Sequence, residues 1–175
     1  MALTRVKKVP TANLVQGSSF LTTSSTLTSS NMPAGSVLQV VHNSNASDVA
    51  LTNDTSTFST AVTADITPSA TSSKILILLE GAADVQNGNY RAINWRILRD
   101  STQVKTMSYH LYDGNQQNHN IDVKTLQVLD SPSTTSQITY SVQARHTSGS
   151  ATSGTYNGYV NRYNTTRVTL FEIAG

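Results

Sequence analysis

The 175-residue chain has no cysteine, little charge and no long apolar run. The absence of cysteine excludes disulfides, zinc–thiolate sites and thiol nucleophiles, and it leaves the redox compartment undecided. The longest strongly apolar run, Ile75–Leu79, is far too short to cross a bilayer, so we expect no membrane insertion. No apolar segment of the secretory type follows the positive charges near the start. We therefore expect a protein made in a cytoplasm and not exported by the usual route.

Charged residues make up only 13% of the chain, and the formal net charge is +2. The 12 Lys and Arg residues are scattered, so no basic stripe follows a phosphate backbone, and we expect no nucleic-acid partner. Serine and threonine instead fill roughly a quarter of the chain. Disorder normally pairs low hydrophobicity with high net charge, which is absent here. A weakly charged, threonine-rich composition favours β-structure, because β-branched hydroxyl residues pack on a sheet and still meet water.

The beginning of the sequence differs from the remainder in its content of large apolar side chains. Residues 1–32 contain few of them, without helical or strand periodicity, and Pro10 interrupts any helix there. After the turn at Pro33-Ala34-Gly35, apolar segments follow one another closely. We therefore predict an extended N-terminal arm, residues 1–32, that is ordered only against a partner, and a self-folding head, residues 33–175.

The head consists of short β-like segments separated by turn residues, and no segment favours a helix. The predicted strands are residues 37–43, 58–67, 74–81, 89–100, 104–112, 121–130, 137–146, 155–163 and 166–175. Their spacing is typical of an all-β sandwich or barrel. Ile75–Leu79 does not alternate, which predicts a strand covered on both faces. Ser44–Asp54 is predicted to be a loop, and Asn87-Gly88 predicts a hairpin turn.

Two predicted strands do alternate clearly between apolar and polar residues. Their apolar positions are Ile93, Trp95 and Ile97 in one strand, and Ile138, Tyr140, Val142 and Ala144 in the other. The final segment LFEIAG is a good strand that ends just before the chain does. Such a strand is usually held inside a sheet, so we expect it to share one end of the molecule with the arm.

Four segments of the head resemble small virion proteins of tailed bacteriophages, of the fibre or decoration type. They are PAGSVLQVV, ITPSATSSKILILLEG, LDSPSTTSQITYSVQAR and RVTLFEIAG. These segments are scaffold patterns without a catalytic motif, and together they extend over residues 33–175. Heads of this type are similar to C1q/TNF-type jelly rolls. The resemblance thus implies an antiparallel jelly-roll β-sandwich that forms a homotrimer.

The resemblance also implies that the arm joins the head to the particle. The opening MALTRV looks like the start of phage fibre and spike proteins whose first residues bind the virion. The residues that would dock there are Leu3, Arg5, Val6, Lys7 and Lys8. Because the arm has no collagen-like repeat and no heptads, a long shaft is not expected. We predict a non-enzymatic short tail fibre that contributes to host attachment. A trimeric capsid decoration protein is the alternative, and a carbohydrate-binding lectin-like module is the remote alternative.

The sequence contains no recognisable catalytic or metal-binding motif. Its only two glutamates, Glu80 and Glu172, lie in predicted strands. The histidines His42, His110, His119 and His146 have no metal-type spacing and are placed near strand ends or loops. The segment Asp113–Asn120 is rich in oxygen donors but matches a calcium loop poorly and is explained as a turn. We expect no cofactor, no metal and no enzyme, a polysaccharide depolymerase being the remote exception.

The segment Thr155–Asn164 combines tyrosines with amide and guanidinium donors. Saccharides are bound by such sets, because a ring face stacks on the sugar and directed donors bond its hydroxyls. The candidate residues are Tyr156, Tyr159, Arg162 and Tyr163. A subunit interface or ordinary packing explains them as well, since tyrosine is favoured there. The same two alternatives hold for Tyr109 and Tyr112, and host-surface polysaccharide and other virion proteins are the expected partners.

Overall fold

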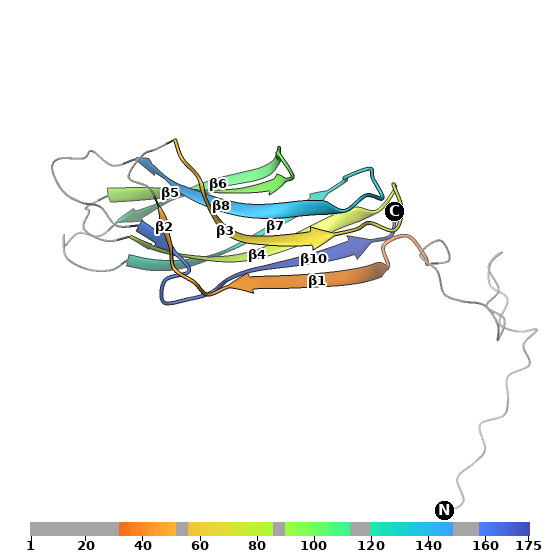
Figure 1. Cartoon of the computed structure of the whole chain (residues 1–175), viewed down its shortest axis with the longest axis horizontal. Coiled ribbons are helices and arrows are strands. Elements are labelled where there is room, and N and C mark those ends of the chain that lie inside the picture. Colours follow the sequence, from red (N-terminus) through yellow and green to blue (C-terminus); the bar gives the residue numbers. More distant parts are fainter. Residues whose placement is uncertain (1–31, 52–55, 86–89, 113–119, 149–157) are drawn as a thin grey trace, which may run out of the picture.

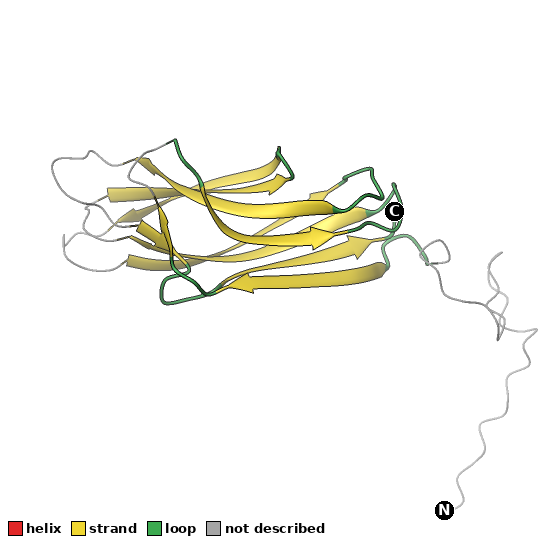
Figure 2. Cartoon of the chain, in the orientation of Figure 1, coloured by secondary structure: helices red, strands yellow, loops and turns green. Residues whose placement is uncertain are grey.

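The computed structural model describes residues 32–51, 56–85, 90–112, 120–148 and 158–175. Within these ranges the chain forms ten β-strands and no helix (Figures 1 and 2), so no helix that could span a membrane occurs there. The strands are β1 Val37–Asn45, β2 Val49–Leu51, β3 Ser59–Ile66, β4 Lys74–Val85, β5 Tyr90–Arg99, β6 Thr102–Tyr112, β7 Asn120–Asp130, β8 Ile138–Ser148, β9 Gly158–Val160 and β10 Thr166–Ile173.

The strands form two antiparallel sheets that pack into a sandwich (Figure 1). Sheet A has the order β1–β10–β4–β7, and the short strands β2 and β9 continue the paths of β1 and β10. Sheet B has the order β3–β8–β5–β6. Because β3 to β4, β4 to β5, β6 to β7 and β7 to β8 each cross between the sheets, the connectivity is that of a jelly roll. The predicted all-β, jelly-roll-like fold class is confirmed.

Two local predictions about turns are wrong. The Asn87-Gly88 residues lie outside the described residues, but β4 and β5, which flank them, belong to different sheets and do not form a hairpin. The predicted loop Ser44–Asp54 contains the end of β1 and the whole of β2. The strand β2 has only three residues and exists because it pairs with β9, a long-range contact that local sequence does not encode.

The core lies between the two sheets and is built from alternate residues of each strand. Trp95 and Tyr140 are its largest buried side chains, and the predicted inward positions of β5 and β8 are confirmed. Strand β4 differs from its prediction, because within one chain only one of its faces is covered. Ile77 is fully buried, whereas the next residue, Leu78, is 37% exposed.

The side of the sandwich between β1 and β3 is closed by side-chain amides of β1. Asn43 Nδ2 donates to the carbonyl of Thr63 at 2.7 Å, and Asn45 Nδ2 donates to that of Ala61 at 2.8 Å. These carbonyls lie on β3, the edge strand of sheet B, where unpaired backbone groups could otherwise form hydrogen bonds with a strand of another molecule. The seam therefore fixes the two sheets together and protects one edge.

The start of the described chain lies beside the C-terminus (Figure 1). The N–H of Gly35 donates to the carbonyl of Ala174 at 2.7 Å, and the N–H of Ala174 donates to that of Ser36 at 2.8 Å. Gly35 has φ = +87°, a left-handed conformation that glycine adopts without strain. The last strand and the beginning of the head thus share one end of the molecule, while the arm, for which this place was predicted, lies outside the described residues.

A buried carboxylate fixes this end. Glu172 in β10 is 1% exposed and accepts hydrogen bonds from the backbone N–H and hydroxyl of Ser69, the hydroxyl of Ser73 and the amide of Gln39. Burial alone raises the pKa of Glu172, but these hydrogen bonds outweigh burial and hold it below its usual value. The carboxylate joins β1, β10 and the loop after β3.

Candidate functional site

The outer face of sheet A carries an unusual number of exposed apolar side chains. The described residues include six exposed large hydrophobic side chains, and five of them lie on this face. With their partly buried neighbours they form a surface that we name the apolar face. Its members are Val37, Val40, Leu76, Leu78, Val123, Leu129, Phe171 and Ile173. Exposed apolar surface of this kind marks a contact with another molecule.

The strand register aligns these side chains into a continuous row across the sheet. Val40 of β1 lies opposite Phe171 of β10, Phe171 lies opposite Leu76 of β4, and Leu76 lies opposite Leu129 of β7. Val40 and Leu129 at the two ends of the row are 54% and 53% exposed. Side chains directly opposite in neighbouring strands contact one another, so the row is one apolar ridge over four strands.

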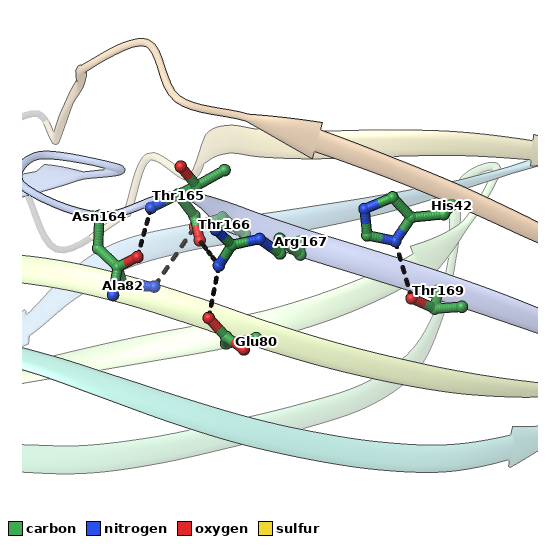
Figure 3. Close-up of polar contacts among 8 residues, drawn as sticks. All are labelled: His42, Glu80, Ala82, Asn164, Thr165, Thr166, Arg167 and Thr169. Carbon is green, nitrogen blue, oxygen red and sulfur yellow. Dashed lines mark hydrogen bonds and ion pairs between the residues drawn. The ribbon is translucent and has the colours of Figure 1, made fainter.

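A depression of ≈ 360 Å³, lined in part by Leu78, lies beside this ridge between β1 and β7. Its charged residues are paired within the chain, since Arg167 Nη1 lies 2.7 Å from Glu80 Oε1 (Figure 3). His42 Nδ1 is 3.0 Å from the hydroxyl of Thr169 in the same view. Within the depression, the charges of Arg167 and Glu80 therefore neutralise each other, while Lys74, opposite Ile173 at one edge of the face, is exposed.

The outer face of sheet B has the opposite chemistry. Arg96 Nε donates to Gln143 Oε1 at 2.8 Å, and Gln143 Nε2 donates to the hydroxyl of Thr60 at 3.2 Å. The guanidinium of Arg96 also lies 3.6 Å from the ring centre of Phe58, which Arg145 approaches to 4.5 Å. Burial, followed by the charge of Arg145, lowers the pKa of Arg96. Polar side chains thus bond one another along this face and meet water.

The two described histidines do not gather into a site. His146 is buried two residues before the end of β8, as the prediction of a place near a strand end requires, whereas His42 lies within β1 and the prediction is wrong for it. Gly158 leaves room for the imidazole of His146. The side chain of His110 and all of His119 lie outside what the structure describes. Among the described residues, no three His, Asp or Glu side chains approach closely enough to hold a metal ion.

The structure brings three of the four candidate tyrosine and arginine residues together. Arg162 Cζ lies 4.2 Å from the ring centre of Tyr159 and 5.5 Å from that of Tyr163. Arg162 Nε lies 3.7 Å from Asp48 Oδ2, so the ion pair also includes a residue that sequence reasoning did not select. Tyr156 lies outside the described residues.

The remaining predicted site residues are not tested by the structure. The arm residues Leu3, Arg5, Val6, Lys7 and Lys8 lie outside the described residues. Tyr109 and Tyr112 lie on β6, but their side chains are not described. The division into a 1–32 arm and a 33–175 head accordingly stays a prediction.

Comparisons with known proteins give no family. No family model and no curated protein matches the chain. Among solved structures, the infectious bursal disease virus VP2 subviral particle matches with a TM-score of 0.45 and 12% identity, over 80% of this chain and 34% of that chain. The Gx strain of this virus gives a TM-score of 0.43 at 12% identity, over 80% and 34% of the two chains.

The T13 particle of the same virus gives a TM-score of 0.40 at 12% identity, over 81% of this chain and 36% of that chain. This chain spans about a third of the length of these viral proteins. At such scores the matches assign neither family nor function. The resemblance to tailed-phage virion proteins therefore stays a prediction.

Proposed function

We propose that the chain is a non-enzymatic virion structural protein, a homotrimeric short tail fibre whose N-terminal arm attaches it to the tail. The observation that carries this proposal is the apolar face, which one chain leaves uncovered. The virion assignment itself rests on the sequence resemblance. Three copies that turn their apolar faces toward a common axis remove this surface from water.

The chemistry of the face favours a second copy as its occupant. A contact between identical surfaces brings like charges together, which is unfavourable unless each charge is neutralised beforehand. The ion pair between Arg167 and Glu80 satisfies this condition for these two residues, and Lys74 lies at the edge of the face. The depression beside the ridge offers space for side chains of the neighbouring copy.

The place where the described chain begins supports attachment at one end. The described chain starts at Met32 beside the C-terminus, and the hydrogen bonds of Gly35 and Ser36 hold that start in place. An arm that leaves there reaches the particle, while the other end of the sandwich faces outward. Leu3, Val6 and the neighbouring basic residues would dock on the tail.

The test is the number of copies on purified particles, measured by quantitative mass spectrometry against the major capsid protein. A short tail fibre predicts a handful of trimers per particle, and antibodies against the head should label the tail in electron micrographs. Tens to hundreds of copies on the shell would instead establish the capsid decoration protein. Absence of the chain from particles would overturn both.

A further inference from the structure

The turn between β9 and β10 exposes an aromatic side chain that is not part of the apolar face. Tyr163 is 64% exposed, and it is the only exposed large hydrophobic residue of the described chain that lies off sheet A's outer face. With Tyr159, Arg162 and Asp48 it forms a group that we name the distal cluster. The guanidinium of Arg162 lies beside both tyrosine rings, a contact that restricts their motion.

The backbone of this turn is held in a conformation that a tyrosine rarely adopts. Asn161 has φ = 71° and Tyr163 has φ = 60°, both in the left-handed region. Asparagine adopts this region readily, whereas for tyrosine it is unfavourable. Backbone strain that persists in an exposed turn is typical of functional sites, because the surrounding structure must enforce it.

Asn161 supplies that enforcement. It is 1% exposed, its N–H donates to the carbonyl of Ala82 at 3.1 Å, and its Nδ2 donates to the carbonyls of Ser47 at 3.1 Å and Ala61 at 3.3 Å. These bonds connect the turn to β4, to β3 and to the loop that contains Asp48. The distal cluster is therefore preorganised by the fold, and a ligand would not have to order it.

The polar groups of the cluster suit a neutral polyol. Arg162 Nε and Asp48 Oδ2 are 3.7 Å apart, too far for a direct hydrogen bond, so a hydroxyl can accept from the guanidinium and donate to the carboxylate. The two charges cancel, which gives no preference for a charged ligand. An exposed tyrosine ring beside this pair offers a surface for the C–H face of a pyranose.

The cluster lies at the end opposite to the arm. In the pairing of β1 with β10, Val37 lies opposite Ile173 at the arm end and Asn45 lies opposite Thr166 at the other end (Figure 1). Eight residues of β10 separate these ends by roughly 25 Å. A particle-bound trimer would thus direct three distal clusters away from its attachment point.

We propose that the distal cluster binds a neutral hexopyranose unit of a host-surface polysaccharide, with Tyr163 as the stacking platform and the Arg162–Asp48 pair bonding its hydroxyls. This inference rests on the proposed function, in which the arm end is fixed and the other end meets the host. Three sites on one trimer would add avidity to a weak single contact.

The test uses saturation-transfer difference NMR on the full-length protein. The probes are the methyl glycosides of glucose, galactose, mannose, rhamnose and N-acetylglucosamine. We expect saturation transfer to the ring C–H protons of at least one probe. Tyr163→Gly should weaken its binding about tenfold, because it removes the stacked ring. Tyr163→Phe keeps the ring and should retain binding.

Tyr163→Gly should not impair folding, because glycine adopts φ = 60° without strain. The Tm of this variant should equal or exceed that of the wild type. Thr63→Ala, on the outer face of sheet B, is the matched surface control and should change neither binding nor stability.

The inference is overturned if no probe receives saturation, if Tyr163→Gly binds normally, or if Tyr163→Gly lowers the trimer mass in light scattering. The last result would make the cluster a subunit contact. A monomeric wild type would instead overturn the proposed trimer, and sugar binding can be measured in either state.

Discussion

The two outer faces of the sandwich are built from strands of the same alternation and yet have opposite chemistry. Across sheet B, Arg96, Gln143 and Thr60 bond one another in sequence from β5 to β3. Across sheet A, the corresponding row runs from Val40 to Leu129 and offers water no hydrogen-bonding group. Within the single chain, sheet B thus presents hydrogen-bonding side chains to water, whereas sheet A exposes an apolar row.

The magnitudes support the proposed trimer. Burying one exposed leucine or valine side chain fully gains about 1.5–3 kcal/mol. The apolar face contains five such side chains that are 37–54% exposed, so each would gain part of this free energy if the proposed trimer covered it. Hydrogen bonds between exposed polar side chains contribute about 0.5–1.5 kcal/mol each and do not require a partner chain. The following variants test this contrast, in order of decreasing expected effect.

Leu129→Asp should break the trimer. The side chain is 53% exposed in the single chain, so the fold tolerates aspartate, but a trimer contact would bury an unpaired carboxylate. We expect a loss of at least about 3 kcal/mol per subunit in association, equivalent to a more than hundredfold shift of the assembly midpoint. Light scattering over a concentration series measures it.

The matched variant on sheet B is Thr63→Asp, at an exposed outward position of β3. It introduces the same charge and should leave the trimer mass unchanged. If Thr63→Asp dissociates the protein as well as Leu129→Asp does, the contrast between the faces is wrong.

Glu172→Gln should destabilise the fold by about 2–3 kcal/mol, because the donors of Ser69, Ser73 and Gln39 lose a buried carboxylate acceptor. Because folding lowers the pKa of Glu172, its contribution to stability is fully present at pH values above the pKa of the unfolded chain, about 4.3. The wild type loses the contribution as the pH falls through the native pKa. Urea midpoints between pH 7 and pH 3 should therefore converge for the two proteins, and parallel curves would refute the assigned role.

Asp130→Asn should cost about 2 kcal/mol. Asp130 Oδ2 lies 2.8 Å from Arg99 Nη1 and accepts from the Tyr140 hydroxyl at 2.7 Å, across the space between the sheets. Burial and this hydrogen bond raise the pKa of Tyr140, so its phenol stays a donor. Thermal unfolding measures the loss. The control is Glu80→Gln, which removes the exposed ion pair with Arg167. It is made in the Leu129→Asp variant, where the proposed trimer contact is absent, and should cost less than about 1 kcal/mol.

Gln143→Ala should have the smallest effect, less than about 1 kcal/mol in unfolding and none in assembly. Its amide bridges Arg96 and Thr60 on a face that water can solvate instead. A Tm shift as large as that of Asp130→Asn would mean that the polar ladder of sheet B is covered in the native protein.

Much of the fold follows from the sequence, because alternation is a local property. The inward residues of β5 and β8, from Trp95 to Tyr140, were predictable from spacing alone. The apolar run in β4 was also visible in the sequence, and it predicted cover on both faces. In the single chain the inner face of β4 is covered, whereas Leu78 on its outer face is 37% exposed.

The remaining features depend on which strands meet. The crossing of β4 to β5 between sheets and the pairing of β2 with β9 are set by the whole sandwich. The candidate site was predictable only in part. Tyr159, Arg162 and Tyr163 were found through their residue types, whereas Asp48 joins them through a contact between segments far apart in sequence.

The mass of the full-length wild-type protein in solution, measured by light scattering after size-exclusion chromatography, tests the central claim most directly. If copies of the chain cover one another's apolar faces, the mass is three times the chain mass of 18.8 kDa and does not fall on moderate dilution. A folded protein that stays at 18.8 kDa at every concentration would contradict the account.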